Sequence, residues 1–72
     1  MNVANITFKE IKQTNDKNII NCVALYHPNP HMRKIALKKC TDKIVLSKSA
    51  CEDPIIWVRK KASAILNNML KV

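Results

Sequence analysis

The chain has 72 residues, enough for one domain, and its core must be built from aliphatic side chains because it holds one Trp, one Tyr and one Phe. It contains no glycine, which excludes glycine-rich phosphate loops and the G-x-S-x-G nucleophile motif. Thirteen Lys and Arg against five Asp and Glu give a net charge of +8, which favours either a polyanionic partner or a coat of solvated lysines.

Two helices are predicted before Pro28. Thr7 and Glu10 have the spacing of a capping box, which predicts a short helix from residue 8 to about residue 13. Asn15 or Asp16 then begins a second helix, in which apolar residues recur at spacings of three and four. Those residues are Ile19, Ile20, Val23 and Tyr26. Pro28 ends this helix.

Three further helices follow, each opened by a capping residue. The pair Asn29-Pro30 predicts a third helix that runs to about Cys40. Asp42 caps a fourth helix, and the pair Asp53-Pro54 opens the longest one, which ends at about Leu70. No segment shows the alternation of a strand. The predicted class is therefore all-α, with four to five helices in two short stacked hairpins.

The last helix carries an apolar stripe along one side. The stripe contains Ile55, Val58, Ala62, Ile65 and Met69, with Leu66 and Leu70 beside it. Trp57 lies about 100° from the centre of this stripe. Trp57 is then either covered by the third helix, which we expect, or free to anchor an interface.

One short pattern occurs twice in the chain. An apolar residue, an arginine, an alanine and a second apolar residue keep the same spacing in Met32-Arg33-Ala36-Cys40 and in Val58-Arg59-Ala62-Leu66. The offset is 26 residues (59 − 33), whereas Pro30 and Pro54 are 24 apart (54 − 30), which predicts two extra residues in the second copy. Self-similarity at this period is typical of arrays whose units bury their apolar faces against each other.

The order Asp-Pro, Val-Arg, Ala and Leu, preceded by a looser Asn-Pro, Met-Arg and Ala copy, resembles the HEAT repeats, in particular the short variety of phycobilisome lyases. The resemblance covers residues 15–70 and implies a right-handed stack of helical hairpins with a concave surface. Residues 1–72 then form a single helical-repeat domain, with residues 1–14 as an N-terminal capping helix. By resemblance, capping falls to Asn29 and Asp53, close helix packing to Ala36 and Ala62, and bridging towards a neighbouring unit to Arg33 and Arg59.

No catalytic or metal site is expected. Cys22, Cys40 and Cys51 fall at or beside apolar helical positions, which predicts buried, reduced thiols in a cytoplasmic protein. His27 and His31 flank two prolines and do not form a zinc-ligand spacing with the cysteines. The five acidic residues are spread out and mostly cap helices, so we expect no enzyme and no cofactor. No apolar run reaches the roughly 20 residues that span a bilayer, so we expect no membrane partner.

The leading functional hypothesis is a non-enzymatic module that binds another protein or forms a homo-oligomer. Repeat arrays usually need about three units, so we expect two units to recruit a partner. The candidate interaction residues are Trp57, Met69 and Leu70. The alternative is a small nucleic-acid-binding protein, with a solvated lysine coat as the simpler explanation of the charge. Its candidate polyanion-binding residues are Lys34, Lys38, Lys60 and Lys61, with Arg33 and Arg59.

Overall fold

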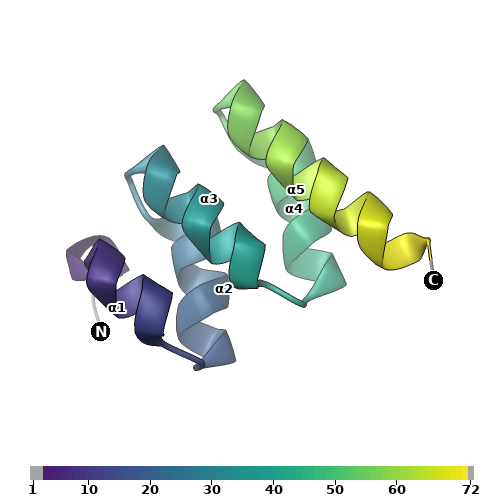
Figure 1. Ribbon diagram of the computed structural model, residues 1–72. Coiled ribbons are helices and arrows are strands. Elements are labelled where there is room, and N and C mark those ends of the chain that lie inside the picture. Colours follow the sequence, from purple (N-terminus) through teal and green to yellow (C-terminus); the bar gives the residue numbers. More distant parts are fainter. Residues whose placement is uncertain (1–2, 72) are drawn as a thin grey trace.

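The computed structural model describes residues 3–71, and over that range it is helical without any strand, which confirms the predicted all-α class (Figure 1). A short 3-10 helix, Val3–Asn5, precedes five α-helices. These are α1 (Phe8–Gln13), α2 (Lys17–Tyr26), α3 (Pro30–Lys39), α4 (Lys43–Glu52) and α5 (Ile56–Leu70).

The helices form two layers. In Figure 1, α1, α3 and α5 lie side by side across the front, with α2 and α4 behind them. Helices α2 and α3 pack together as the first hairpin, and α4 and α5 as the second hairpin. The two hairpins meet through α3 and α5 in one layer and through α2 and α4 in the other. α1 covers the first hairpin, so the second hairpin forms the opposite end of the stack.

Side-chain caps set the start of the first four helices. The Thr7 hydroxyl accepts from the Glu10 amide and the Glu10 carboxylate accepts from the Thr7 amide, which completes the predicted capping box. Asp16, Asn29 and Asp42 cap α2, α3 and α4 by accepting from backbone amides of the first turn. Each oxygen replaces the carbonyl partner that a helix start lacks.

α5 begins later than predicted, and the prediction that Asp53 is its N-cap is wrong. The N-cap position belongs to Ile55, which makes no side-chain cap bond. Asp53 is instead the C-cap residue of α4, where its amide donates to the Ser49 carbonyl. One oxygen of its carboxylate accepts from the Ile55 amide at 2.9 Å. Asp53 therefore shapes the turn between α4 and α5 rather than the first turn of α5.

The two hairpins correspond at one constant offset. α2 and α4 begin at Lys17 and Lys43, 26 residues apart (43 − 17), and α3 and α5 begin 26 residues apart at Pro30 and Ile56 (56 − 30). Pro28 therefore corresponds to Pro54. The predicted insertion of two residues, which came from matching Pro30 with Pro54, is wrong.

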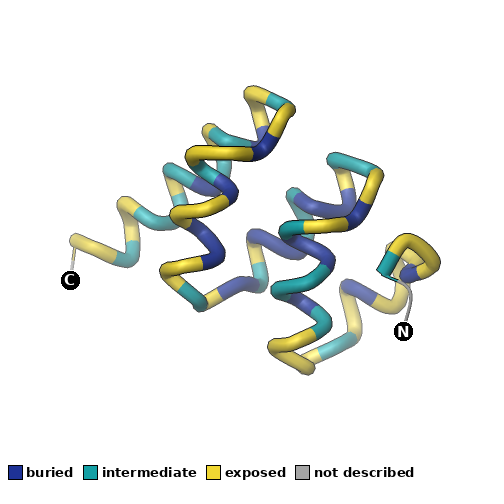
Figure 2. Tube along the Cα trace, turned by 180° about the vertical axis from the view of Figure 1, so that it is seen from behind, coloured by how far each residue is buried: buried dark blue, intermediate teal, exposed yellow. Residues whose placement is uncertain are grey.

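The core is aliphatic and lies where the helices face each other, as the dark blue segments in Figure 2 show. Its largest fully buried side chains are Ile11, Val23, Leu37, Leu46 and Val58. Ala36 and Ala62 are 0% exposed, which confirms that they occupy positions of close packing. The rest of the predicted α5 stripe, Ile55, Ile65 and Met69, is half-buried against this core.

Candidate functional site

A buried ion pair joins the two hairpins. From α3, Arg33 donates from Nε to Asp53 Oδ2 at 2.8 Å and from Nη2 to Asp53 Oδ1 at 3.1 Å. Its Nη1 donates to the backbone oxygens of His27 at 2.7 Å and Pro28 at 3.3 Å. Arg33 thus bridges to the neighbouring hairpin, as expected. Because Arg33 is only 7% exposed, it is not available to a polyanion, contrary to its prediction as a phosphate-binding residue.

Arg59 is the counterpart of Arg33 in the second hairpin. Its Nη1 donates to the backbone oxygen of Asp53 at 2.6 Å. The side chain is half-buried and forms no ion pair among residues 3–71. Arg59 therefore has donor capacity that Arg33 has already used.

The four candidate lysines lie on helices that contain no acidic residue. α3 and α5 carry no Asp or Glu. The lysines, called the lysine face below, are Lys34, Lys38, Lys60 and Lys61. Among the described residues, none of these lysines makes a hydrogen bond. The one ion pair there is that of Arg33 with Asp53. Their charges are therefore not neutralised by this part of the chain.

Trp57 lies between the two hairpins and remains partly exposed. Its ring centroid is 5.0 Å from that of His31, the residue at the corresponding position of the first hairpin. The Lys34 Nζ lies 5.7 Å from the centroid, within the range of a cation–π contact. The residue as a whole is 38% exposed. α3 therefore covers one part of Trp57, and another part is free to meet a partner.

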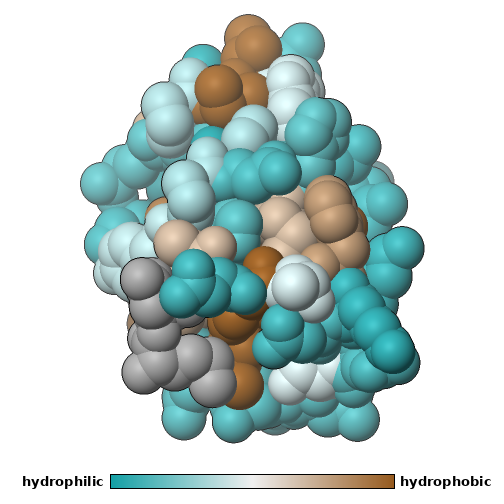
Figure 3. Space-filling model, turned by 90° about the vertical axis from the view of Figure 1, so that its left-hand side faces the viewer, coloured by the Kyte–Doolittle hydropathy of each residue, from teal (hydrophilic) through white to brown (hydrophobic). Residues whose placement is uncertain are grey.

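Exposed large apolar side chains are concentrated on the second hairpin. Residues 3–71 include six of them, and four belong to α4 and α5: Ile44, Ile56, Trp57 and Leu70. Of the two predicted contact residues at the end of α5, Leu70 is 60% exposed, whereas Met69 is half-buried against the core. The side formed by the N-terminal helices is mostly hydrophilic, but it also shows apolar surface at the top of the view, to the right of its centre and in a strip below the centre (Figure 3).

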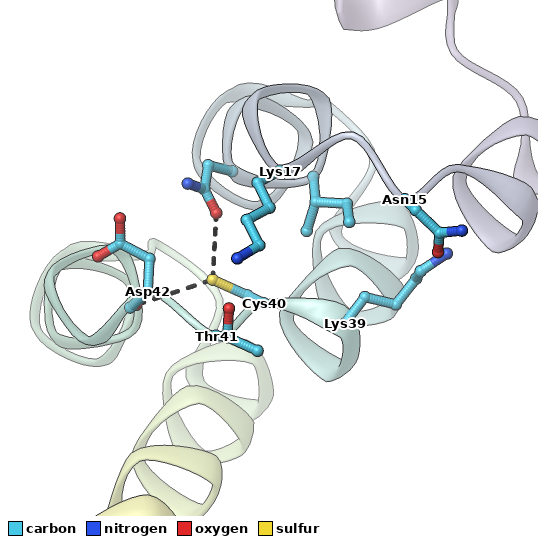
Figure 4. Close-up of a pocket in the computed structure, with 8 residues that line it drawn as sticks. Asn15, Lys17, Lys39, Cys40, Thr41 and Asp42 are labelled. Atoms are coloured by element: carbon cyan, nitrogen blue, oxygen red, sulfur yellow. Dashed lines mark hydrogen bonds between the residues drawn. The ribbon is translucent and has the colours of Figure 1, made fainter.

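A pocket of about 600 Å³ opens between α2, the end of α3 and the turn that leads to α4 (Figure 4). At its centre the Cys40 thiol donates to Asn21 Oδ1 at 3.3 Å and to the Asp42 carbonyl at 3.8 Å. Burial raises the pKa of this thiol above its ordinary value of 9.0, so the reactive thiolate is disfavoured. Lys39 points away from the thiol in Figure 4. The pocket thus offers no activated nucleophile.

Lys39 has a structural role that the sequence did not suggest. Its Nζ donates to the backbone oxygens of Ile11 at 3.0 Å and Lys12 at 2.9 Å, and also to that of Thr14. These carbonyls lie at the end of α1, where helical partners are missing. Lys39 therefore fastens α1 to the first hairpin. A run of two lysines at a helix end gave no sign of which one would do so.

The histidines and cysteines are used separately. The buried His27 ring lies 3.3 Å from the Ile6 carbonyl and accepts from the Asn29 amide at 3.0 Å. The His31 ring contacts Trp57 at an angle of 39°. Cys40 is buried as predicted, but Cys51 is exposed, so the prediction of three buried thiols is wrong. Within residues 3–71 no group of three His, Cys, Asp or Glu could hold a metal ion. No helix in this range is long and apolar enough to cross a membrane.

No family model matches this chain, and no curated protein or solved structure was found to be similar to it.

Proposed function

We propose that this chain is a non-enzymatic helical module that binds another protein, or a second copy of itself, through the exposed apolar side chains of its second hairpin. The observation that carries this proposal is the exposure of Ile44, Ile56, Trp57 and Leu70 on that hairpin. The corresponding residues of the first hairpin are smaller or more polar: Asn18, Pro30 and His31 stand in the places of Ile44, Ile56 and Trp57. The fold accepts polar residues there, so large apolar ones point to an interface.

The use of the acidic side chains supports a function without catalysis. Glu10, Asp16 and Asp42 accept from backbone amides at helix starts, Asp53 pairs with Arg33, and Glu52 is exposed at the end of α4. General acid–base chemistry needs carboxylates or a base placed near a reacting group, and this arrangement leaves no such pair.

The constant offset between the hairpins supports the HEAT-like assignment. Their helices start at corresponding positions, and the buried Ala36 and Ala62 fall at equivalent places on α3 and α5. Three free cysteines support a reducing compartment such as the cytoplasm.

Exchange of residues between the hairpins tests the proposed interface. The double variant Ile44→Asn, Trp57→His carries the residues that the first hairpin has at the same positions, so it should fold normally. We expect light scattering to show that the wild-type chain self-associates, or that it forms a discrete protein complex when a cell extract supplies the partner. In the double variant, whichever of these two forms the wild type shows should be lost. Tyr26→Glu, which installs the counterpart Glu52 on the first hairpin, is the matched control and should change neither result.

Two results together would contradict this proposal. The wild-type chain would stay monomeric at high micromolar concentration, and it would bind the same proteins from the extract as the double variant does. Unfolding curves of the three proteins must coincide for the comparison to count as a test of binding.

The lysine face supports nucleic-acid binding as a second candidate function. Lys34, Lys38, Lys60 and Lys61 are free of acidic neighbours on α3 and α5, and Lys34 lies over the partly exposed Trp57. Lysines that contact phosphates release counterions, so four contacts on duplex DNA predict a slope of log affinity against log salt of about −3.6. Lys60→Gln removes one contact and should make this slope less negative by about one.

Lys43→Gln is the control for this second function, because Lys43 is equally exposed but lies on α4. If both variants weaken DNA binding equally, the charge acts as a diffuse coat and the lysine face is not a binding site.

A further inference from the structure

The two arginines of the chain are anchored in the same way. Each lies four residues into corresponding helices, and each Nη1 donates to the backbone oxygen six residues earlier. The distances are 2.7 Å from Arg33 to His27 and 2.6 Å from Arg59 to Asp53. Both guanidinium groups are therefore fixed at one edge by their own hairpin.

The other edge of Arg33 shows what this arrangement binds. Nε and Nη2 form two parallel bonds to the Asp53 carboxylate, which comes from the turn of the next hairpin. That carboxylate is held in place by the Ile55 amide as well. A planar guanidinium with two parallel donors matches a carboxylate in geometry as well as in charge.

The same edge of Arg59 has no carboxylate partner among residues 3–71. The residue is half-buried. Ile56, one turn earlier on α5, is 58% exposed and adds an apolar neighbour.

We propose that Arg59 receives the carboxylate of an acidic partner protein, supplied by an Asp in the turn before a helix that packs on α5 as α5 packs on α3. This inference rests on the proposed protein-binding function and names the chemistry of the partner. An acidic partner also complements the net charge of +8.

A second copy of this chain does not supply that carboxylate in the same geometry. The first hairpin has His27, not an acid, at the position of Asp53. His27 is buried against Ile6, and the 3-10 helix and α1 pack on this hairpin. The site therefore favours a different protein.

A synthetic peptide provides a direct probe. Its sequence, Asp-Pro-Ile-Ile-Trp-Val-Arg-Glu-Glu-Ala-Ser-Ala-Ile-Leu, copies residues 53–66 with Glu at the places of Lys60 and Lys61, and a hydrocarbon staple keeps it helical. Because Arg33 and Arg59 are the only arginines, side-chain Nε–H NMR signals of the full chain report on each separately. We expect the peptide to shift the Arg59 signal and to slow its hydrogen exchange, with the Arg33 signal unchanged.

The pairing itself is tested by removing each partner. We expect binding to weaken about tenfold when Asn replaces the first Asp of the peptide, and equally when the chain carries Arg59→Gln. The two changes combined should weaken binding no further. Lys43→Gln removes one positive charge elsewhere and should leave the affinity unchanged. Equal affinity of the two peptides, equal losses for Lys43→Gln and Arg59→Gln, or no binding would overturn the inference.

The outcome separates this inference from the proposed function. If the peptide does not engage Arg59 while Ile44→Asn, Trp57→His still abolishes association, the interface stands and the carboxylate assignment falls. A concentration-dependent Arg59 shift and a doubled molar mass without peptide would identify a second copy as the occupant and would also overturn the inference.

Discussion

Arg33 and Arg59 differ in environment far more than in local sequence. Both follow an apolar residue and precede a lysine, yet one is enclosed between two hairpins and the other is half-exposed at the end of the stack. Because their surroundings differ, the same substitution should lower the free energy of unfolding by different amounts at the two positions.

Arg33→Gln should destabilise the protein by about 3–5 kcal/mol, because it leaves the buried Asp53 carboxylate without its positive partner. Arg59→Gln is the matched control and should cost about 1 kcal/mol, the net value of one hydrogen bond. Urea unfolding followed by circular dichroism measures both. Equal losses for the two variants would contradict the distinction between a paired and an unpaired arginine.

Cys40 makes stability depend on pH. Burial raises the pKa of its thiol above 9.0, so the folded chain keeps the proton where the unfolded chain has already released it. The stabilisation is fully present below pH 9 and is lost as the pH rises through the raised pKa. We therefore expect the difference in unfolding free energy between wild type and Cys40→Ala to shrink above about pH 9.

Cys51→Ala, which removes an exposed thiol, is the control for this titration. Its unfolding free energy should follow that of the wild type across the same pH range. A constant difference between wild type and Cys40→Ala would mean that the buried thiol does not contribute to the pH dependence.

At the scale of the helices, the close approach of α5 to the rest of the core depends on one small residue. Ala62 is 0% exposed, and Ala62→Leu should overpack the site and cost about 1–3 kcal/mol. Ala64→Leu adds the same atoms on the exposed side of α5 and should change stability by no more than about 0.5 kcal/mol. If the thermal melts of the two variants coincide, Ala62 lies outside the tightly packed core.

Local sequence signals predicted most of the helices. The caps at Thr7, Asn29 and Asp42 act within one turn, so their positions follow from short spacings alone. The start of α5 could not be predicted in this way, because Asp53 is also bound by Arg33, which lies 20 residues earlier. The local pair Asp53-Pro54 gives no information about a side chain so distant in the sequence that binds the same carboxylate. The matching pairs Asp16 and Asp42, or Pro28 and Pro54, could have revealed the register.

The candidate surfaces were predicted only in part. Charge identified Lys34, Lys38, Lys60 and Lys61, but it could not show that Arg33 is enclosed or that Lys39 binds the end of α1. Apolar residues at a helix end gave no means to separate Met69 from Leu70. These distinctions depend on which neighbour covers each side chain, and that neighbour is distant in the sequence.

Across the whole molecule, α1 depends on a single lysine for its attachment at the carbonyl end. Lys39→Gln should loosen the carbonyl end of α1 without unfolding the hairpins, because it removes charge-assisted bonds to three backbone oxygens while Ile11 stays buried in the core. We expect amide hydrogen exchange in residues 8–14 to accelerate about tenfold, with α4 and α5 unchanged. Lys38→Gln, at the exposed neighbouring position, is the control. Uniform acceleration throughout the chain would show that α1 and the hairpins unfold together.

The joint between Arg33 and Asp53 also sets an order for events on the ribosome. The first hairpin is complete in sequence at Lys39, whereas the carboxylate that Arg33 binds belongs to the turn of the second hairpin. Until Asp53 emerges, 20 residues after Arg33, the guanidinium has only the backbone oxygens of the preceding turn. A nascent chain of this protein therefore cannot lock its first hairpin to its second before the turn at Asp53 has been synthesised.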